Sequence, residues 1–254
     1  MKLSDLLDEL RTNILNDRSD RTAGSADYLW TDATLVRYIN EAQRRFAKRG
    51  YVIRDNTTSE VVNVTIVAGQ TEYTLHQAIL AVVSAKISGS QADLVRIGHS
   101  ALGSFSNPST MIYSPSFETL APGAPLAYTT DETLGEDDEG TITSLTLRVF
   151  PTPRTADAGT VIKLRVVRMP LDDLTTNDLG ASPEIPADSH LEMLDWAAYL
   201  ALRIVDDDAG SPKRAAEFAA TFESHVQEAR KLVLRKLFAP RSWGFGAGGF
   251  SWEG

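Results

Sequence analysis

The sequence predicts an α+β fold: a helical bundle formed by the N- and C-terminal helices, with an antiparallel β-rich segment inserted between them. Apolar residues recur at helical spacing in residues 1–50, alternate with polar residues over most of 51–185, and return to helical spacing in 186–238. Pairing the apolar faces of the two helical ends leaves the middle as a sandwich or barrel-like insertion. Residues 239–254 are expected to form an extended, flexible tail rich in glycine and aromatic residues.

Two helices are expected in residues 1–50. The first has an apolar stripe at steps of three and four, formed by Leu3, Leu6, Leu7, Leu10 and Ile14. After a polar link, Thr31 is a good N-cap for a second helix, which we expect Gly50 to end. The apolar stripe of this second helix consists of Leu35, Ile39, Ala42 and Phe46.

Short strands are expected from Tyr51 to about Met169. The stretch VVNVTIVAGQTEYTL predicts a hairpin in which residues 68–70 turn the chain, because apolar and polar residues alternate on both sides of that turn. Further strands are indicated by ILAVVSAKI, SLTLRVF and TVIKLRVVRM, which are rich in β-branched residues and are bounded by turn residues.

Two more helices are expected after Pro186. The stretch HLEMLDWAAYLALRIVDDD has helical spacing at Leu191, Leu194, Ala198, Ala201 and Val205. Ser211 as N-cap and Pro212 at the first helical position then predict a longer helix that runs to about Phe238. Its stripe consists of Phe218, Phe222, Val226, Ala229, Val233 and Leu237.

The net charge is −9, which argues against a protein whose main task is to grip a phosphate backbone. Asp131–Glu139 contains six acids and no base; we expect a solvated loop there, since the spacing does not fit a calcium loop. The absence of cysteine excludes disulfides and thiol chemistry. With no long apolar run and no secretory leader in its first residues, the chain is expected to be soluble and cytoplasmic, without a membrane contact.

No catalytic constellation is indicated, and we expect a protein that is not an enzyme. In GHSALG the second glycine comes one residue too late for a nucleophile elbow around Ser100, and no parallel sheet is expected there. The four histidines are scattered and lack metal-ligand spacing. The tail stretch GFGAGG follows no strand, so nothing supports phosphate binding. Metal and cofactor sites are therefore not expected.

The order of segments resembles the head-to-tail adaptor, or connector, proteins of tailed bacteriophages. The resemblance covers about residues 1–238 and rests on LWTDATLVRYINEAQRRFA, VTIVAGQTEYTL, GAPLAY, LRVFPTP, VIKLRVVRMPLDDL and PEIPADSHLEMLDWAAYLAL. It implies a structural virion protein at the head–tail junction, made in the bacterial host cytoplasm. It also implies a ring of copies, twelve in number, beneath the portal protein, with tail or nozzle proteins as further partners. DNA would pass through the ring without sequence-specific binding.

Two groups of residues are candidates for partner binding. In the tail, large aromatic residues among glycines are expected to fill apolar pockets on a neighbouring subunit or the portal: Trp243, Phe245, Phe250 and Trp252. Alternatively, the tail folds back on its own core or stays disordered. On the basic helix between Arg37 and Arg49, the cations of Arg44, Arg45 and Lys48 are expected to face an acidic partner; the alternative is a solvated helix face.

The alternative function is that of a β-rich carbohydrate-binding or surface-recognition module of a virion. Such a module would be expected to place its aromatic residues on strands or loops of the β-rich segment. All four tryptophans, Trp30, Trp196, Trp243 and Trp252, lie outside that segment. This distribution favours the adaptor.

Overall fold

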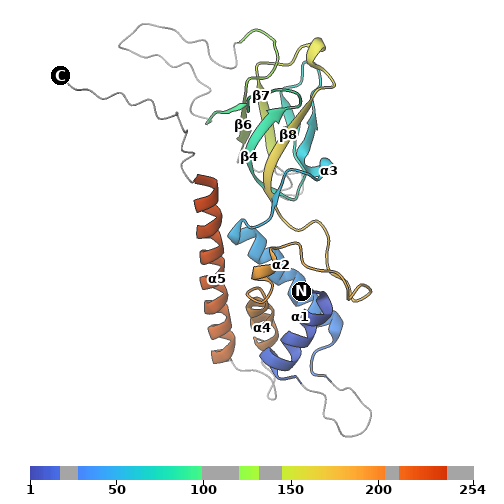
Figure 1. The fold of residues 1–254 in the computed structure, drawn as a ribbon, viewed down its shortest axis with the longest axis vertical. Coiled ribbons are helices and arrows are strands. Elements are labelled where there is room, and N and C mark those ends of the chain that lie inside the picture. Colours follow the sequence, from blue (N-terminus) through green and yellow to red (C-terminus); the bar gives the residue numbers. More distant parts are fainter. Residues whose placement is uncertain (18–27, 99–119, 132–144, 204–211, 239–254) are drawn as a thin grey trace, which may run out of the picture.

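The computed structural model describes residues 1–17, 28–98, 120–131, 145–203 and 212–238 (Figure 1). The helices are α1 (Leu3–Glu9), α2 (Asp32–Gly50), α3 (Ser59–Val62), α4 (Leu194–Leu202) and α5 (Pro212–Phe238). The strands are β1 (Arg54–Asp55), β2 (Asn63–Thr65), β3 (Glu72–Thr74), β4 (Ile79–Ile87), β5 (Val95–Arg96), β6 (Ala127–Asp131), β7 (Thr146–Phe150) and β8 (Val161–Arg168). The expected α+β class is confirmed. Helices α1, α2, α4 and α5, here called the helical part, lie at one end of the molecule, and strands β1–β8, the β part, at the other.

The first helix forms as expected but changes its winding at Leu10. Residues Leu10–Leu15 continue α1 as a π-helical turn, which ends at Asn16 in the left-handed conformation with φ of 57°. Leu3, Leu6 and Leu10 are fully buried. The turn also buries Arg11, whose guanidinium donates to the Trp30 carbonyl at 2.8 Å. Arg11 thereby fixes the start of α2 against α1.

Helix α2 begins and ends where the sequence predicted. Thr31 Oγ1 accepts a hydrogen bond from the Thr34 amide at 3.3 Å, which confirms the N-cap. The helix ends at Gly50 as expected, but Gly50 keeps helical geometry and Tyr51 takes the left-handed cap position with φ of 56°. A Cβ on Gly50 would approach Val52 Cγ1 to 3.1 Å and Ala229 to 3.8 Å. Gly50 is therefore needed for close packing rather than for its φ angle.

The C-terminal helices differ from expectation at one end of α4. Leu191 was assigned to the apolar stripe, but its side chain is 51% exposed and α4 begins only at Leu194. Residues 187–193 instead form a 3₁₀ turn and further turns that lead into the helix. Helix α5 spans the range that the sequence predicted, and its Phe222 is fully buried. Val205 and Ser211 lie outside the described residues.

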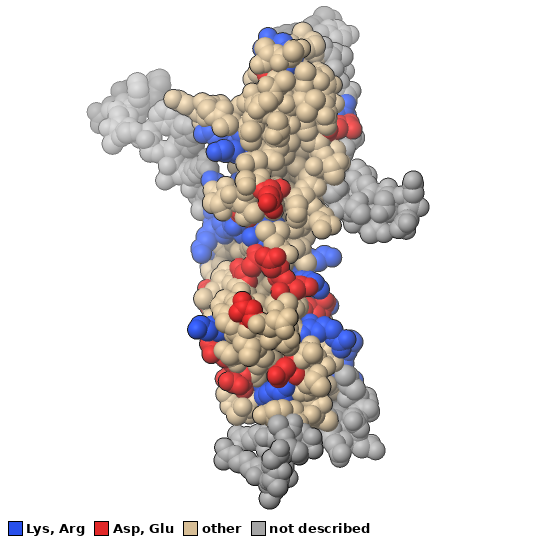
Figure 2. Space-filling model, turned by 90° about the vertical axis from the view of Figure 1, so that its right-hand side faces the viewer, with Lys and Arg blue, Asp and Glu red and all other residues tan. Residues whose placement is uncertain are grey.

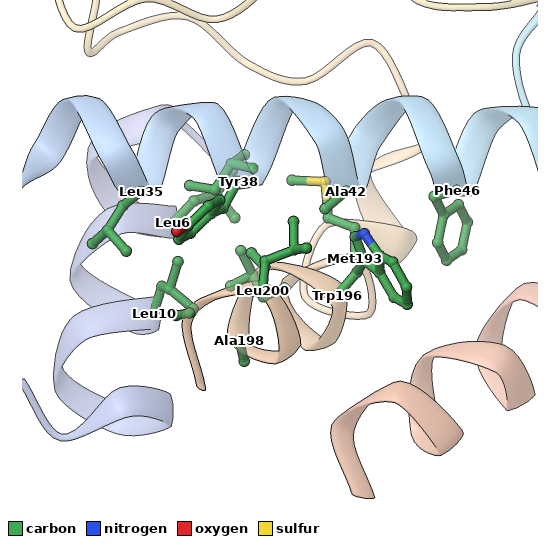
Figure 3. Close-up of a cluster of buried hydrophobic side chains, with 14 of the residues drawn as sticks. Leu6, Leu10, Leu35, Tyr38, Ala42, Phe46, Met193, Trp196, Ala198 and Leu200 are labelled. Carbon is green, nitrogen blue, oxygen red and sulfur yellow. The ribbon is translucent and has the colours of Figure 1, made fainter. Parts of the chain in front are cut away.

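One apolar core joins the helical elements from both ends of the chain (Figure 3). Helix α2 directs Leu35, Tyr38 and Ala42 toward α1 and α4, and its Phe46 ring lies edge-on to Phe222 of α5, with ring centroids 5.8 Å apart. Trp196 of α4 stacks at a tilt on Phe222 of α5, with ring centroids 5.2 Å apart. This cluster buries a face of every helix of the helical part. In the described residues, no helix is both long and apolar enough to cross a membrane.

The β part contains two four-stranded sheets. In the first, β8 is central: β4 pairs along one edge, while β1 and β2 share the other, all antiparallel. The second has the order β3-β7-β6-β5, in which only the short β5 is parallel to its neighbour. Leu147 of one sheet and Ile162 of the other are fully buried in a common cluster. Neither sheet closes into a barrel within the described residues.

The predicted hairpin is wrong in its pairing. Strand β2 pairs with β8 and strand β3 pairs with β7, so the turn between them crosses from one sheet to the other. Gly69, with φ of 76°, makes this turn, and the Tyr73 hydroxyl donates to the Gln70 carbonyl at 2.9 Å across it. Alternation correctly indicated that Ile66 and Tyr73 are buried, but both strands find their partners far along the chain.

The chain passes between the two parts twice, through residues 51–53 and 169–186. The longer passage is fastened to α2, because the buried Asn40 side chain donates to the Leu174 carbonyl at 2.8 Å and accepts from its amide at 2.9 Å. It also caps α1: the Leu3 and Ser4 amides donate to the carbonyls of Ala181 and Leu179. The passage is thus held to the helical part at two points.

A buried ionic network links the two passages. Arg168, at the end of β8, donates from Nε to Asp55 Oδ2 at 2.7 Å and from Nη1 to Glu184 Oε2 at 2.5 Å. The Asp55 carboxylate also accepts from the Thr57 and Thr58 amides, and Glu184 from the Leu171 and Asp172 amides. Although burial opposes it, hydrogen bonds from amides and from Arg168 hold the pKa of both carboxyls below their ordinary values.

We expect Arg168→Met to lower the free energy of unfolding by about 3–5 kcal/mol, because the substitution leaves two partly or fully buried carboxylates without their counterion. Arg165→Met is the matched control, since Arg165 is an exposed arginine on the same strand. Urea unfolding of both variants measures the difference. Equal loss in the two variants would contradict a special role of Arg168.

Acidic pH should destabilise the protein through the same network. The unfolded chain takes up protons on these carboxyls near pH 4, where the folded protein still excludes them. Their contribution to stability is therefore complete above about pH 5 and is lost as the pH falls toward the depressed folded values. Burial raises the pKa of Asp195, which acts in the opposite sense. Unfolding measured between pH 7 and pH 3 should show a steeper fall for the natural protein than for Arg168→Met.

Candidate functional site

The predicted partner-binding cations of α2 do not form one patch. Arg45 is half-buried against the helical core: its guanidinium carbon lies 3.7 Å from the centroid of the Trp196 ring, and its Nη2 lies 4.0 Å from Glu223 Oε1. A guanidinium stacked on an indole in this way contributes to packing as well as to charge. The Arg45 side chain therefore helps to join α2, α4 and α5.

Arg44 points to another neighbour. It forms an ion pair with Asp173 in the passage that returns from the β part, and both side chains are about half exposed. At such exposure an ion pair contributes little to stability, but it adds a second contact between α2 and that passage, beside the one that Asn40 makes. Of the three predicted cations, Lys48 alone is exposed without an ion pair to the described part of the chain.

Lys48 lines a hollow of about 370 Å³ where the helical part meets the β part. Three elements form its walls: the C-terminal end of α2, the start of β4 and the middle of α5. Here it is called the basic hollow, and it is lined by Lys48, Arg49, Tyr51, Leu80, Glu223, Val226, Gln227 and Arg230. Its residues come from sequence positions nearly two hundred residues apart.

The chemistry of the basic hollow is cationic with an apolar component. Arg49 and Glu223 form an ion pair and largely neutralise each other. Lys48 and Arg230 remain as exposed positive charges, and the Arg230 guanidinium carbon lies 5.3 Å from the centroid of the Tyr51 ring. Leu80 and Val226 add apolar surface. Such a hollow suits a carboxylate-bearing segment of a protein partner better than a small apolar ligand.

Tyr51 was not identified from the sequence. A tyrosine in the left-handed conformation is uncommon, because its Cβ crowds the following carbonyl, and this conformation at the end of a helix usually belongs to glycine. Here glycine occupies position 50, where α5 passes closely, and Tyr51 takes the cap. No local pattern would have identified this site, since the basic hollow forms only when α2, β4 and α5 meet.

The remaining predicted site residues lie outside the described part of the chain. Trp243, Phe245, Phe250 and Trp252 are among these residues, as are Ser100 and His99. Most of the acidic stretch 131–139 is also outside, and only Asp131, at the end of β6, is described. The roles of these residues stay predictions.

The described histidines serve structural contacts. His190 is buried, its Nε2 lies 3.0 Å from the Ile185 carbonyl, and burial lowers its pKa. His225 Nδ1 lies 3.2 Å from Asp195 Oδ2 and joins α5 to α4. Within the described ranges, no three His, Cys, Asp or Glu residues are grouped so that they could hold a metal ion. The expected absence of metal, cofactor and catalytic sites stays a prediction.

Comparison with known families gives one match. The chain matches the family described as SU10 adaptor protein over residues 1–243, which is nearly its whole length. A search of curated proteins finds no match.

Alanine substitutions should distinguish Arg45, which packs against the helical core, from Lys48, which is exposed to a partner. Arg45→Ala should lower the free energy of unfolding by about 1–2 kcal/mol, since it removes the contact with Trp196 and the approach to Glu223. Lys48→Ala should change it by no more than about 0.5 kcal/mol, because Lys48 is exposed and forms no ion pair with the described residues. Thermal and urea unfolding measure both. A loss for Lys48→Ala as large as that for Arg45→Ala would contradict this assignment.

Proposed function

Because the chain belongs to the SU10 adaptor protein family of phage adaptors, we propose that its copies form a ring beneath the portal and join the portal to the tail around the DNA channel. The protein is a structural component of the virion. The ring would contain twelve copies, as the family resemblance implies. Its partners would be the portal protein, neighbouring copies and tail or nozzle proteins.

The observation that carries this proposal is the extent of the family match, which includes both the helical part and the β part. A ring subunit needs a rigid body with different surfaces for its two neighbours. The fully buried helical core and the fastened passage between the parts supply such a body. A catalytic centre is not needed for this role.

The charge of the protein is compatible with a DNA conduit. A ring of subunits that each bear a net charge of −9 would have few strong contacts with phosphates, so a duplex would slide through without being held. Exposed basic side chains on α2 and α5 would then serve protein partners rather than DNA.

The alternative carbohydrate-binding function receives no support from the described residues. Sugar binding would need exposed aromatic faces on the β part, but Tyr73, Tyr128 and Phe150 are all buried there. Trp30 and Trp196 belong to the helical core. The adaptor is therefore the only function that we propose.

We expect the tail to serve attachment rather than folding. Replacing Trp243 and Trp252 together with Ala should weaken binding to the portal of the same phage by orders of magnitude, since large aromatic anchors contribute on the order of several kcal/mol across an interface. The melting temperature of the free protein should stay unchanged, because the stripe of α5 ends near Phe238. Co-purification with the co-expressed portal and thermal unfolding are the two measurements.

Ser242→Ala with Ser251→Ala is the matched control for changes within the tail, and it should leave both measurements unchanged. A melting temperature lowered by many degrees with intact portal binding would show that the aromatic residues belong to the subunit's own core. If the unaltered protein did not associate with the portal at all, the proposed ring would be refuted.

A further inference from the structure

A second charged surface lies in the passage between β8 and α4. Residues 171–180, with the sequence LDDLTTNDLG, form part of the passage between β8 and α4 and are here called the acidic loop. All of its residues except Leu174 are exposed. No lysine or arginine stands anywhere between Arg168 and Arg203. Figure 2, which faces this side, shows acidic side chains gathered at about the level where the helical and β parts meet.

The acidic loop is held in a fixed shape. Asn40 fastens Leu174 by two hydrogen bonds, and the Ser4 amide of α1 donates to the Leu179 carbonyl at 3.1 Å. At its tip, Asp178 Oδ1 accepts from the Gly180 amide at 3.1 Å. A loop anchored on both sides of its exposed residues loses little conformational entropy when it binds.

Two of its carboxylates are available to a partner. Asp173 pairs with Arg44, whereas Asp172 and Asp178 form no ion pair with the described part of the chain. Leu171 and Leu179 are exposed beside them, at 37% and 45%. The acidic loop thus combines negative charge with apolar surface, which complements Lys48, Arg230 and the apolar residues of the basic hollow.

Gln43 supplies an independent sign that a partner belongs here. Its side chain is only 1% exposed and lines a hollow of about 300 Å³ together with Asp172, Asp178 and other residues of the acidic loop. Its Oε1 is buried and has no hydrogen-bond partner in the described chain. A buried acceptor without a donor is costly, and a cationic side chain inserted from outside would satisfy it.

The acidic loop and α5 lie on different sides of α2. In Figure 1 the acidic loop, in gold, is to the right of α2 and α4, and α5, which forms one wall of the basic hollow, is to the left. Different surfaces on opposite sides of a subunit generate head-to-tail contacts, and these close into a ring when the rotation between copies allows it. Complementary charge sets the register of such contacts.

We propose that the acidic loop of one copy docks into the basic hollow of the next copy, so that the same contact repeats around the ring. The exposed cations of Lys48 and Arg230 face the carboxylates of Asp172 and Asp178 across this contact. Basic residues further along α5, Lys231 and Arg235, lie beside it and supply donors for the hollow at Gln43. The inference rests on the proposed ring and names its subunit interface.

Charge reversal on one surface at a time tests the docking. The loop variant is Asp172→Lys with Asp178→Lys, and the hollow variant is Lys48→Glu with Arg230→Glu. Each is co-expressed with the portal of the same phage, and the fraction of portals that carry a complete ring is counted by electron microscopy. Each variant alone should form at least tenfold fewer rings than the natural protein, because like charges then meet at every contact. Thermal unfolding checks that the monomers stay folded.

Mixing the two variants should restore the rings. A reversed loop then meets a reversed hollow and a natural loop meets a natural hollow, so copies of the two variants alternate around a ring of even number. Combining all four substitutions in one chain should restore rings as well. The control Asp8→Lys with Glu60→Lys makes the same change in net charge as the loop variant, at exposed acids away from both surfaces, and should assemble normally.

The outcomes separate this interface from the proposed function. If the natural protein forms rings and both reversed variants do so equally well, the docking is wrong and the adaptor function stands. If the variants fail alone and the mixture also fails, the charges contact the portal rather than a neighbouring copy, and the docking is again wrong. If the natural protein forms no ring on the portal, the proposed function itself fails.

Cross-linking gives a second measurement, since the chain contains no cysteine. Asp178→Cys and Arg230→Cys copies, mixed in one ring, should form disulfide-linked dimers under mild oxidation. Position 178 lies beside Leu179 in the acidic loop, and position 230 lies one helical turn after Val226 in the basic hollow. A disulfide between the two positions would therefore report the approach of the loop to the hollow. Rings that contain both variants but form no such dimer would overturn the docking.

Discussion

The contact of Arg168 with Asp55 and Glu184 determines how the two parts of this protein are joined. Asp55 lies just after the chain enters the β part, and Glu184 just before it returns to the helices, so the one guanidinium holds both passages. The carboxylates are satisfied further by backbone amides, which is the condition under which a buried ionic group is tolerated. The position of β4 relative to α2 and α5, and thus the basic hollow, depends on this junction.

The helical part and the β part each have a separate apolar cluster. Separate clusters of this kind do not determine how the two parts are oriented toward each other. Polar contacts at the junction fix this orientation: the Arg168 network, the two hydrogen bonds between Asn40 and Leu174, and the carbonyls that cap α1. Directional hydrogen bonds are suited to this task because they are lost with small rotations, whereas apolar contacts tolerate sliding.

The surfaces that we assign to assembly lie next to these junction contacts. The acidic loop is part of the passage that Asn40 fastens, and the basic hollow forms where α2 ends in the left-handed Tyr51. A structural ring protein benefits from interfaces of this kind, since rigid surfaces lose little entropy on docking. It also keeps charged groups exposed that would add nothing to the stability of a free monomer.

The sequence alone determined the α+β class, the bounds of α2 and α5, the Thr31 cap, most of the buried stripes and the family. These features depend on local spacing, because apolar residues that repeat every 3.6 residues in a helix or every 2 in a strand indicate which face of the element is buried. Only the tertiary structure decided what covers each face: β2 and β3 pair with β8 and β7 instead of each other, Leu191 stays exposed, and Gly50 packs against α5 while Tyr51 takes the cap. The same holds for the cations of α2. Their charge can be read from the sequence. Whether Arg44 meets Asp173 and Arg45 meets Trp196, while Lys48 forms no ion pair within the described ranges, depends on contacts between residues more than a hundred positions apart, which no local pattern records.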